Sequence, residues 1–292
     1  MGARLCQRDG RRDRKKELPM TQALNPRYDK YRHLRLSHNG GVLTITLSNP
    51  GKKNACTPEM GYELSLIWDD VALDSQVKIV VITGDGQDFC AGVDMSDQKR
   101  KFAAEREGGP VHPTTRRARH LIMSILECEK PVIAKVRGAA YGMGVNIALA
   151  CDMVFAAQGA RLCDSHVKAG MVAGDGGILL WPLAIGFHRA KQYLMTGEPL
   201  TAEKAEQIGL INKCLPDDQL DAQVQEMAER LMALPPHAVN YTKVALNVAL
   251  KQMTASAFEA SLAYEVYTMG TDDFKEATTA FLEKRPPLYK GR

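Results

Sequence analysis

Apolar and polar residues alternate between Tyr31 and Ser48, with Leu34, Leu36, Leu43 and Ile45 among the apolar positions. A period of two is the pattern of a half-buried β-strand. Asn39-Gly40-Gly41 interrupts the alternation with residues that tolerate positive φ, so the segment predicts a β-hairpin.

Three further segments are apolar on both faces: Lys78–Thr83, Pro131–Val136 and Met153–Ala157. Such strands are typical of the interior of a parallel sheet. A helix is expected to begin at Thr57-Pro58-Glu59, which supplies a capping hydroxyl, a proline at the first helical position and an acidic residue. Another helix is expected over about 143–150. Strands that alternate with helices predict an α/β fold.

After about Pro216 the strand patterns end and three helical patterns follow, over Gln219–Leu234, His237–Met253 and Ala257–Leu282. The polar segment Asp97–Arg119 contains Gly108-Gly109-Pro110, and we expect a mobile entrance loop or a variable surface loop there. The expected organisation is a basic, disordered leader over 1–26, an α/β core over 27–215 and a helical region over 216–292.

The net charge of +4 comes from the leader, because residues 1–20 contain seven basic and three acidic residues and the other 272 residues are neutral overall. A basic field over the folded part is therefore absent, which argues against a nucleic-acid partner. Met20 offers a second start site, and the leader lacks the serine-rich, acid-poor composition of a transit peptide.

The seven cysteines are odd in number and contain no Cys-x-x-Cys pair, which predicts reduced thiols in a cytoplasmic protein and no metal site. The longest apolar stretches, such as Ile178–Ile185, are interrupted by Trp181-Pro182 and fall short of the roughly 18 residues that a membrane span needs. We therefore expect no membrane partner.

Two glycine-containing turns, Phe89–Met95 and Gly138–Asn146, each follow a β-branched strand and lead toward an expected helix. The first N–H groups of a helix lack intrahelical partners, and the helix dipole favours negative charge beside them. Two such turns directed at one atom would form an oxyanion hole, which stabilises the oxygen of a reacting carbonyl or thioester.

A set of short motifs in fixed order extends from about Tyr31 to the C-terminus. Its members are Asn49-Pro50, Asn54-Ala55, Phe89–Asp94, Pro131–Ala134 before Gly138, Cys151-Asp152, Gly170, Gly176-Gly177, Thr196-Gly197, Ala202–Ala205, Gly209-Leu210 and Phe281–Arg285. Together they resemble the crotonase (enoyl-CoA hydratase/isomerase) superfamily. The resemblance implies a spiral of ββα units with a C-terminal helical trimerisation region. It also implies an acyl-CoA thioester substrate, no permanently bound cofactor (CoA enters as part of the substrate), and homotrimers that often pair into hexamers.

The resemblance further implies positions for the site. The oxyanion donors would be the N–H groups of Val93 and Met143, the backbone near Asn54-Ala55 and Ala91 would contact adenine, and Lys284 would reach a CoA phosphate. Asp94 and Asp164 flank the site, and we expect both to fix turns. The expected substrate- and CoA-binding residues are Asn54, Ala55, Ala91, Gly92, Asp94, Gly142 and Lys284.

The chain departs from the family at the proton-transferring positions, where hydratases have two glutamates and this sequence has Asn146 and His166. Asparagine does not titrate, whereas a histidine with an ordinary pKa near 6.5 can exchange protons at neutral pH. The alternative for His166 is a structural role. Asp175 fits either an acid–base role or an N-cap before Ile178.

The leading hypothesis is hydration or double-bond migration of an enoyl-CoA, with Val93, Met143, His166, Asn146 and Asp175 as the catalytic set. An alternative is hydrolysis by a CoA-thioester hydrolase, a C–C bond hydrolase or a dehalogenase-like enzyme that uses His166 and Asp175. An alternative of another class is a non-catalytic CoA-thioester binding protein, because both usual glutamates are absent.

Overall fold

A six-stranded sheet is the centre of the computed structural model, which describes residues 23–96 and 114–292. The strand order is β1-β2-β3-β4-β6-β9, with β1 antiparallel to β2 and every other neighbouring pair parallel. The predicted hairpin and the predicted parallel strands are confirmed. The strands are β1 (Leu34–Asn39), β2 (Val42–Leu47), β3 (Ile79–Gly84), β4 (Val132–Val136), β6 (Met153–Ala157) and β9 (Lys213–Leu215).

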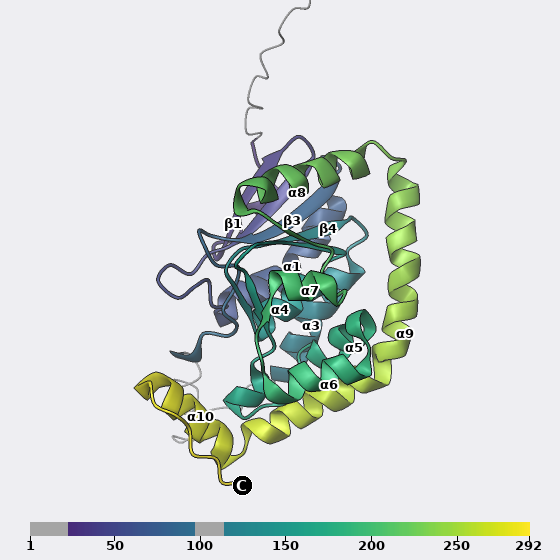
Figure 1. Ribbon diagram of the computed structural model, residues 1–292. Helices are drawn as coiled ribbons and strands as arrows, with labels where there is room; N and C mark the ends of the chain where they lie inside the picture. Colours follow the sequence, from purple (N-terminus) through teal and green to yellow (C-terminus); the bar gives the residue numbers. More distant parts are fainter. Residues whose placement is uncertain (1–22, 97–113) are drawn as a thin grey trace, which may run out of the picture.

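The central strands β3 and β4 are buried on both faces of the sheet, whereas every second residue of the edge strand β1 is exposed. Alternate residues of each strand point to opposite sides. In β3, Val80 and Ile82 join the larger hydrophobic core, whereas Ile79 and Val81 join the smaller one beneath α8. Figure 1 shows α8 along one side of the sheet and α1, α3 and α4 along the other. The helices are α1 (Pro58–Leu73), α3 (Thr114–Glu127), α4 (Met143–Ala150) and α8 (Asp217–Met232).

Helix α1 begins as predicted, because the Thr57 side chain accepts a hydrogen bond from Met60 N and Pro58 stands at the first helical position. The loop expected over 97–119 ends earlier than predicted, because α3 begins at Thr114. Residues 114–119 belong to α3, and residues 97–113 lie outside the described part of the chain. Residues 1–22 of the expected leader also lie outside it and stay a prediction, whereas the last leader residues are ordered: Asn25 caps the short helix η1 (Pro26–Tyr28), and Leu24 packs against the core.

A second, three-stranded sheet has the order β5-β7-β8 and lies beside short helices. Its strands contain two or three residues each, too few for a hydrophobic period to be seen in the sequence. The elements of this region are β5 (Ala139–Tyr141), β7 (Arg161–Cys163), η2 (His166–Ala169), α5 (Gly177–Ile185), α6 (Phe187–Thr196), β8 (Leu200–Thr201) and α7 (Ala202–Gln207).

Helices alone follow β9 in the described chain: α8, α9 (Pro236–Met269) and α10 (Asp272–Glu283). The prediction of separate helices over 237–253 and 257–282 was wrong. No glycine or proline separates those ranges, so the backbone stays helical through them, although Figure 1 shows that α9 changes direction along its course. The break comes at Gly270, after which the Thr271 side chain caps α10 by accepting from Phe274 N.

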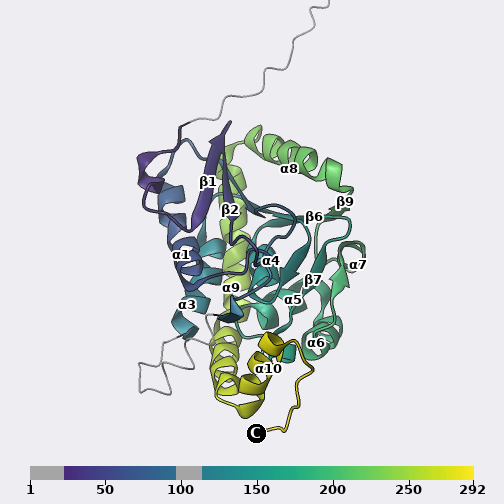
Figure 2. The same cartoon turned by 90° about the vertical axis from the view of Figure 1, so that its left-hand side faces the viewer.

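Helix α9 runs along most of the molecule in the view of Figure 2. Buried polar contacts attach its first half to the core. Lys243 Nζ lies 2.8 Å from Asp152 Oδ2 and donates to Lys130 O at 2.9 Å, and Asn247 Nδ2 donates to Leu126 O at 2.8 Å. Because Lys243 is almost fully buried, the ion pair fixes where α9 crosses the core.

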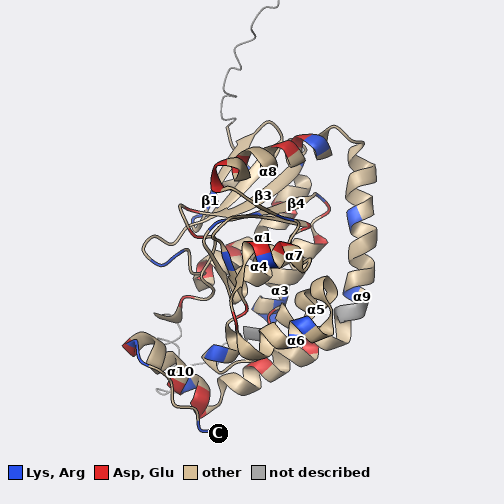
Figure 3. Cartoon of the chain, viewed as in Figure 1, with Lys and Arg blue, Asp and Glu red and all other residues tan. Residues whose placement is uncertain are grey.

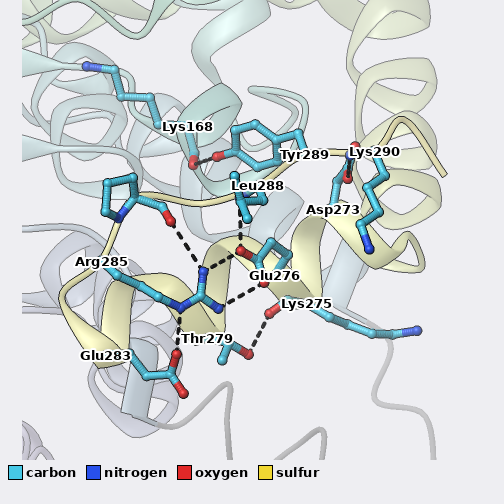
Figure 4. A network of polar contacts seen from close by, with 11 residues as sticks. Lys168, Asp273, Lys275, Glu276, Thr279, Glu283, Arg285, Leu288, Tyr289 and Lys290 are labelled. Atoms are coloured by element: carbon cyan, nitrogen blue, oxygen red, sulfur yellow. Dashed lines mark hydrogen bonds and ion pairs between the residues drawn. The ribbon is translucent and has the colours of Figure 1, made fainter.

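The chain segment after α10 folds back over that helix (Figure 4). Arg285 Nη1 lies 2.5 Å from Glu276 Oε1, and Lys290 N donates to Asp273 Oδ1 at 2.6 Å. Tyr289 Oη donates to Lys168 O at 2.5 Å, which attaches the segment to η2, the short helix that contains His166.

Within the described residues the cysteines are free thiols: Cys56, Cys90, Cys128, Cys151, Cys163 and Cys214. Across the same described ranges, no helix has the length and apolar character that crossing a bilayer requires.

Candidate functional site

The two glycine-containing turns contact each other directly. Cys90 N donates to Ala139 O and Tyr141 N donates to Cys90 O, both at 2.9 Å. Gly144 makes the approach possible, because an added Cβ there would lie 2.2 Å from Cys90 O. The hydrogen bonds therefore join Phe89–Met95 to Gly138–Asn146, which were predicted as two separate helix starts.

The N–H groups of Val93 and Met143 receive no acceptor among the hydrogen bonds of the described residues. Met143 is the first residue of α4, and its N-cap, Gly142, has no side chain to cap the helix. On either side of Val93, Cys56 N donates to Gly92 O and Asp94 N donates to Cys56 O. These contacts hold the first turn while leaving the Val93 N–H available to a ligand.

His166 lies in a buried polar cluster next to the second turn. Its Nδ1 is 2.7 Å from Asp164 Oδ1, and its Nε2 is 3.2 Å from Asp175 Oδ2. Asn146 Nδ2 joins the two carboxylates, donating to Asp175 Oδ1 at 2.8 Å and to Asp164 Oδ2 at 3.2 Å. The structure thus brings together Asn146, His166 and Asp175, the three candidates for proton handling, and adds Asp164.

Electrostatics in this cluster favour a protonated imidazole. Burial by itself lowers the pKa of His166, but the carboxylates of Asp175 and Asp164 outweigh it and raise that pKa well above the ordinary value. For Asp164 the two effects are reversed. Burial raises its pKa, but the positive charge and the hydrogen bond of His166 outweigh burial and bring that pKa below the ordinary value. Each imidazole nitrogen faces a carboxylate oxygen, an arrangement that suits a ring protonated on both nitrogens.

Asp175 does not cap α5, so that alternative was wrong. The N-cap of α5 is Gly176, without a side-chain hydrogen bond, and the Asp175 carboxylate faces His166 and Asn146 instead. The expectation that Asp164 only fixes a turn was also incomplete. It accepts from His166 N, as a turn residue would, but its carboxylate also pairs with the imidazole.

Glu265, on α9, was missed by the sequence analysis. Its carboxylate and that of Asp175 each place an oxygen within 4.8 Å of one another and of a ring nitrogen of His166. Burial and, second, the charge of Asp175 raise the pKa of Glu265 to about 8. One signal was present in the sequence, because Glu265 is the only charged residue between Glu259 and Asp272.

The two candidate segments for CoA binding lie side by side. Ala91 N donates to Lys53 O at 3.0 Å, and Ala55 is buried next to Cys56, which pairs with Val93. The Asn54 side chain points inward and donates to Asp85 O and Asp88 O, so it shapes the turn. The Asn54 side chain is therefore not available to a ligand, and the contact with adenine expected near Asn54 would have to come from backbone groups.

Asp94 and Lys284, two further residues expected to bind CoA, lie outside the buried His166 cluster. Asp94 fixes a turn, as expected, by accepting from Ser96 N at 3.0 Å, and it pairs with Lys52 Nζ at 3.1 Å. Lys284 is exposed at the end of α10 and contributes to none of the cluster's hydrogen bonds.

The contacts of the buried cluster also bear on metal binding. In the described part of the site, both imidazole nitrogens of His166 face carboxylates, so neither is open to a metal and we assign none to the cluster. The expectation that no metal or permanent cofactor is bound stays a prediction.

Comparison with known proteins identifies the family. A family model described as enoyl-CoA hydratase/isomerase matches residues 37–292. A probable enoyl-CoA hydratase of Rhodobacter capsulatus is 33% identical over 267 residues, which are 90% of this chain and 99% of that protein. The 1,2-epoxyphenylacetyl-CoA isomerase of Escherichia coli is 31% identical over 265 residues, covering 88% of this chain and 98% of that protein.

Solved structures agree with the sequence comparison. The crystal structure of an enoyl-CoA hydratase/isomerase from Mycobacterium paratuberculosis superposes with a TM-score of 0.77 at 32% identity, covering 85% of this chain and 97% of that one. The mixed α/β core with a C-terminal helical region is the arrangement that the sequence resemblance predicted. The chain therefore belongs to the enoyl-CoA hydratase/isomerase family and has the crotonase fold.

Proposed function

We propose that the protein is an acyl-CoA enzyme that binds the thioester oxygen of its substrate between the N–H groups of Val93 and Met143. The observation that carries the proposal is the contact between the two turns, which leaves these two donors without acceptors in the described chain. The proton-handling cluster lies next to them, since a Cβ added at Gly142 would lie 3.7 Å from His166 Cε1.

The chemistry follows from the charge that develops on the thioester oxygen. When the α-carbon gains carbanion character, this oxygen becomes an enolate oxyanion. Donors that are already fixed stabilise it without reorganisation. We expect removal of one such donor to cost about 10²–10³ in kcat.

We assign proton acceptance to Asp175. Its carboxylate is held by Asn146 and His166, whereas His166 has both nitrogens engaged and cannot take up a further proton. His166 would then act as a fixed cation that positions Asp175, and Asn146 as an amide that orients both aspartates. The reaction proposed is hydration or migration of the double bond of an enoyl-CoA, with CoA entering as part of the substrate.

Hydrolysis with His166 as the base receives no comparable support. A histidine that activates water needs a nitrogen that is free to accept a proton, and both nitrogens of His166 face carboxylates. A CoA-thioester binding protein would differ from the proposed enzyme only in having no turnover. Analysis of the products therefore distinguishes the proposed enzyme, a hydrolase and a binding protein.

A substrate panel tests the proposal. The protein is incubated in D₂O with enoyl-, dienoyl-, aryl- and 3-oxoacyl-CoA thioesters, and the products are analysed by mass spectrometry. We expect a hydrated or isomerised product that carries deuterium at the α-carbon. Release of free CoA or C–C cleavage would favour a hydrolase, and tight binding with neither turnover nor deuterium uptake would indicate a binding protein.

We also propose that the chain self-associates as a homotrimer or a hexamer of this chain, as the family resemblance implies. Helix α9 has only four charged residues among 34, and Figure 3 shows long tan stretches between its coloured segments. Several large apolar side chains on α6 and α9 are exposed: Phe187, Met195, Tyr241, Leu246 and Tyr267. Burying these side chains would be favourable.

Size-exclusion chromatography with light scattering checks the assembly. We expect a particle with three or six times the mass of the 32.1 kDa chain. A monomer at micromolar concentration would contradict this part of the proposal.

A further inference from the structure

Helix α9 presents three polar residues to the segment that leads into α5. Ser261 Oγ donates to Gly174 O at 3.0 Å, and Thr268 Oγ1 accepts from Val172 N at 3.2 Å. Glu265 lies between them, at spacings of four and three residues that place all three on one helix face. The two outer hydrogen bonds therefore fix the position from which Glu265 reaches the site.

Gly174 leaves the space that the Glu265 carboxyl occupies. A Cβ added at Gly174 would lie 2.6 Å from Glu265 Oε2 and 2.5 Å from Ser261 O. Oε2 is buried and has no hydrogen-bond partner in the described residues. Because an unpaired buried carboxylate is costly, this oxygen needs a proton or a partner that arrives with the substrate.

The surroundings of Glu265 differ sharply from those of Asp175. Both oxygens of Asp175 have partners: Oδ1 accepts a hydrogen bond from Asn146 Nδ2 at 2.8 Å, and Oδ2 lies 3.2 Å from His166 Nε2. Three charged groups face Glu265. Burial and the carboxylates of Asp175 and Asp164 raise the pKa of Glu265, and His166 lowers it, with a result of about 8. Two carboxyls in such different environments are suited to act as an acid and a base.

The separation between the two carboxyls suits a shared water molecule. A water that donates to one oxygen and accepts from another spans up to about 5.6 Å, given hydrogen bonds of about 2.8 Å. The nearest oxygens of Asp175 and Glu265 lie within 4.8 Å of one another. One water can therefore contact both.

We propose that Glu265 is the second proton-transferring carboxyl of this site and completes, with Asp175, an acid–base pair for adding water to an enoyl-CoA. The inference rests on the acyl-CoA function proposed above. Protonated Glu265 gives its proton to the α-carbon, while water forms a bond from its oxygen to the β-carbon and gives a proton to Asp175. Asp175 is then protonated, with a proton that came from water, and Glu265 is ionised. Transfer of that proton from Asp175 to Glu265 across the short gap restores both groups. The pair thus takes the role of the two glutamates that the family resemblance implies at positions 146 and 166. Asp175 and Glu265 occupy other positions in the chain.

Glu265→Gln tests the pair, because glutamine keeps the size of the side chain but does not transfer a proton. We expect kcat to fall about 100-fold with KM nearly unchanged, as for removal of a general acid. In the wild type, kcat should also decline as pH rises through about 8, where Glu265 loses its proton, and this decline should be absent from the residual activity of the variant. Deuterium uptake at the α-carbon should fall together with kcat.

Glu259→Gln is the matched control, because Glu259 lies on the same helix but is exposed and pairs with Arg119. It should retain wild-type kcat and pH dependence. If the wild type turns over and Glu265→Gln keeps both its kcat and the decline near pH 8, the inference is wrong and the acyl-CoA function stands. If the wild type turns over no thioester, the proposed function itself is wrong.

Thermal unfolding gives a readout that does not depend on activity. The folded protein keeps the Glu265 proton up to about pH 8, whereas an unfolded chain releases it near its ordinary pKa of about 4.3. Stability should therefore decrease as pH rises between these values. Glu265→Gln should lose less of its melting temperature than the wild type between pH 5 and pH 8.5. Equal losses would show that Glu265 is not held protonated, which overturns the inference.

Discussion

Asp175→Asn is expected to lower kcat by about 10³-fold while leaving KM within a few-fold of the wild type, within the range for loss of a general base. Asparagine keeps the size of the side chain and can still contact Asn146, but it accepts no proton and gives His166 no charge. Steady-state kinetics on the thioester that the panel identifies, together with a melting curve, measures both effects. The imidazole keeps Asp164 as its partner, so we expect the fold to persist.

Asp175→Asn should also change how kcat depends on pH. Asp175 is, after burial, the strongest influence that raises the pKa of Glu265. Without that charge, the alkaline decline of the residual kcat should move below pH 8. Asp221→Asn is the control, since Asp221 on α8 pairs with Lys135 and Arg137 at the surface. Asp175→Asn that keeps kcat within threefold of the control would show that Asp175 is not the proton acceptor.

Local patterns were sufficient to predict much of the fold. Helix α1 begins where Thr57 and Pro58 place it, because a cap is a contact between residues three apart in the chain. Strand β3 was recognisable because both of its faces are apolar, whichever helices cover them. The end of α9 was misjudged although the first glycine after Pro236 is Gly270, where the helix ends.

The site was predictable only where the family fixes a position. Asn146, His166 and Asp175 stood out because the family resemblance implies acidic residues at or close to these positions, and the structure brings the three together. Their interaction was not predictable. Whether His166 acts as a base or as a fixed cation depends on Asp164 and Asp175 facing opposite nitrogens of one ring.

Glu265 illustrates the remaining limit. It is about 90 residues from Asp175 in the chain, and its burial arises because α9 docks on the segment at Gly174. In the sequence it is one acid in a helical pattern, where most acids are exposed to solvent. The pKa that marks it comes from burial and from Asp175, so it becomes visible only when the two segments are placed together.

Gly144→Ala is expected to separate the two turns. The added Cβ would lie 2.2 Å from Cys90 O and 2.9 Å from the carbonyl carbon, both backbone atoms of the first turn. Backbone cannot rotate away as a side chain can, so α4 or the first turn has to move. We expect a loss of about 1–3 kcal/mol of stability and, because the donors proposed at Val93 and Met143 would no longer face one oxygen, a fall in kcat of at least about 10²-fold.

Gly61→Ala provides the comparison, since Gly61 also lies in a helix but its added Cβ would meet only Cys56 Sγ, at 3.4 Å. Alanine in a helix interior is favoured over glycine by about 0.5–1 kcal/mol, so this variant should be as stable as the wild type or more so. Chemical denaturation measures stability, and the thioester assay measures kcat. Gly144→Ala that unfolds like the wild type would show that the turns can part without cost. A destabilised variant with unchanged kcat would show that their contact holds the fold but does not place the two donors on the thioester oxygen.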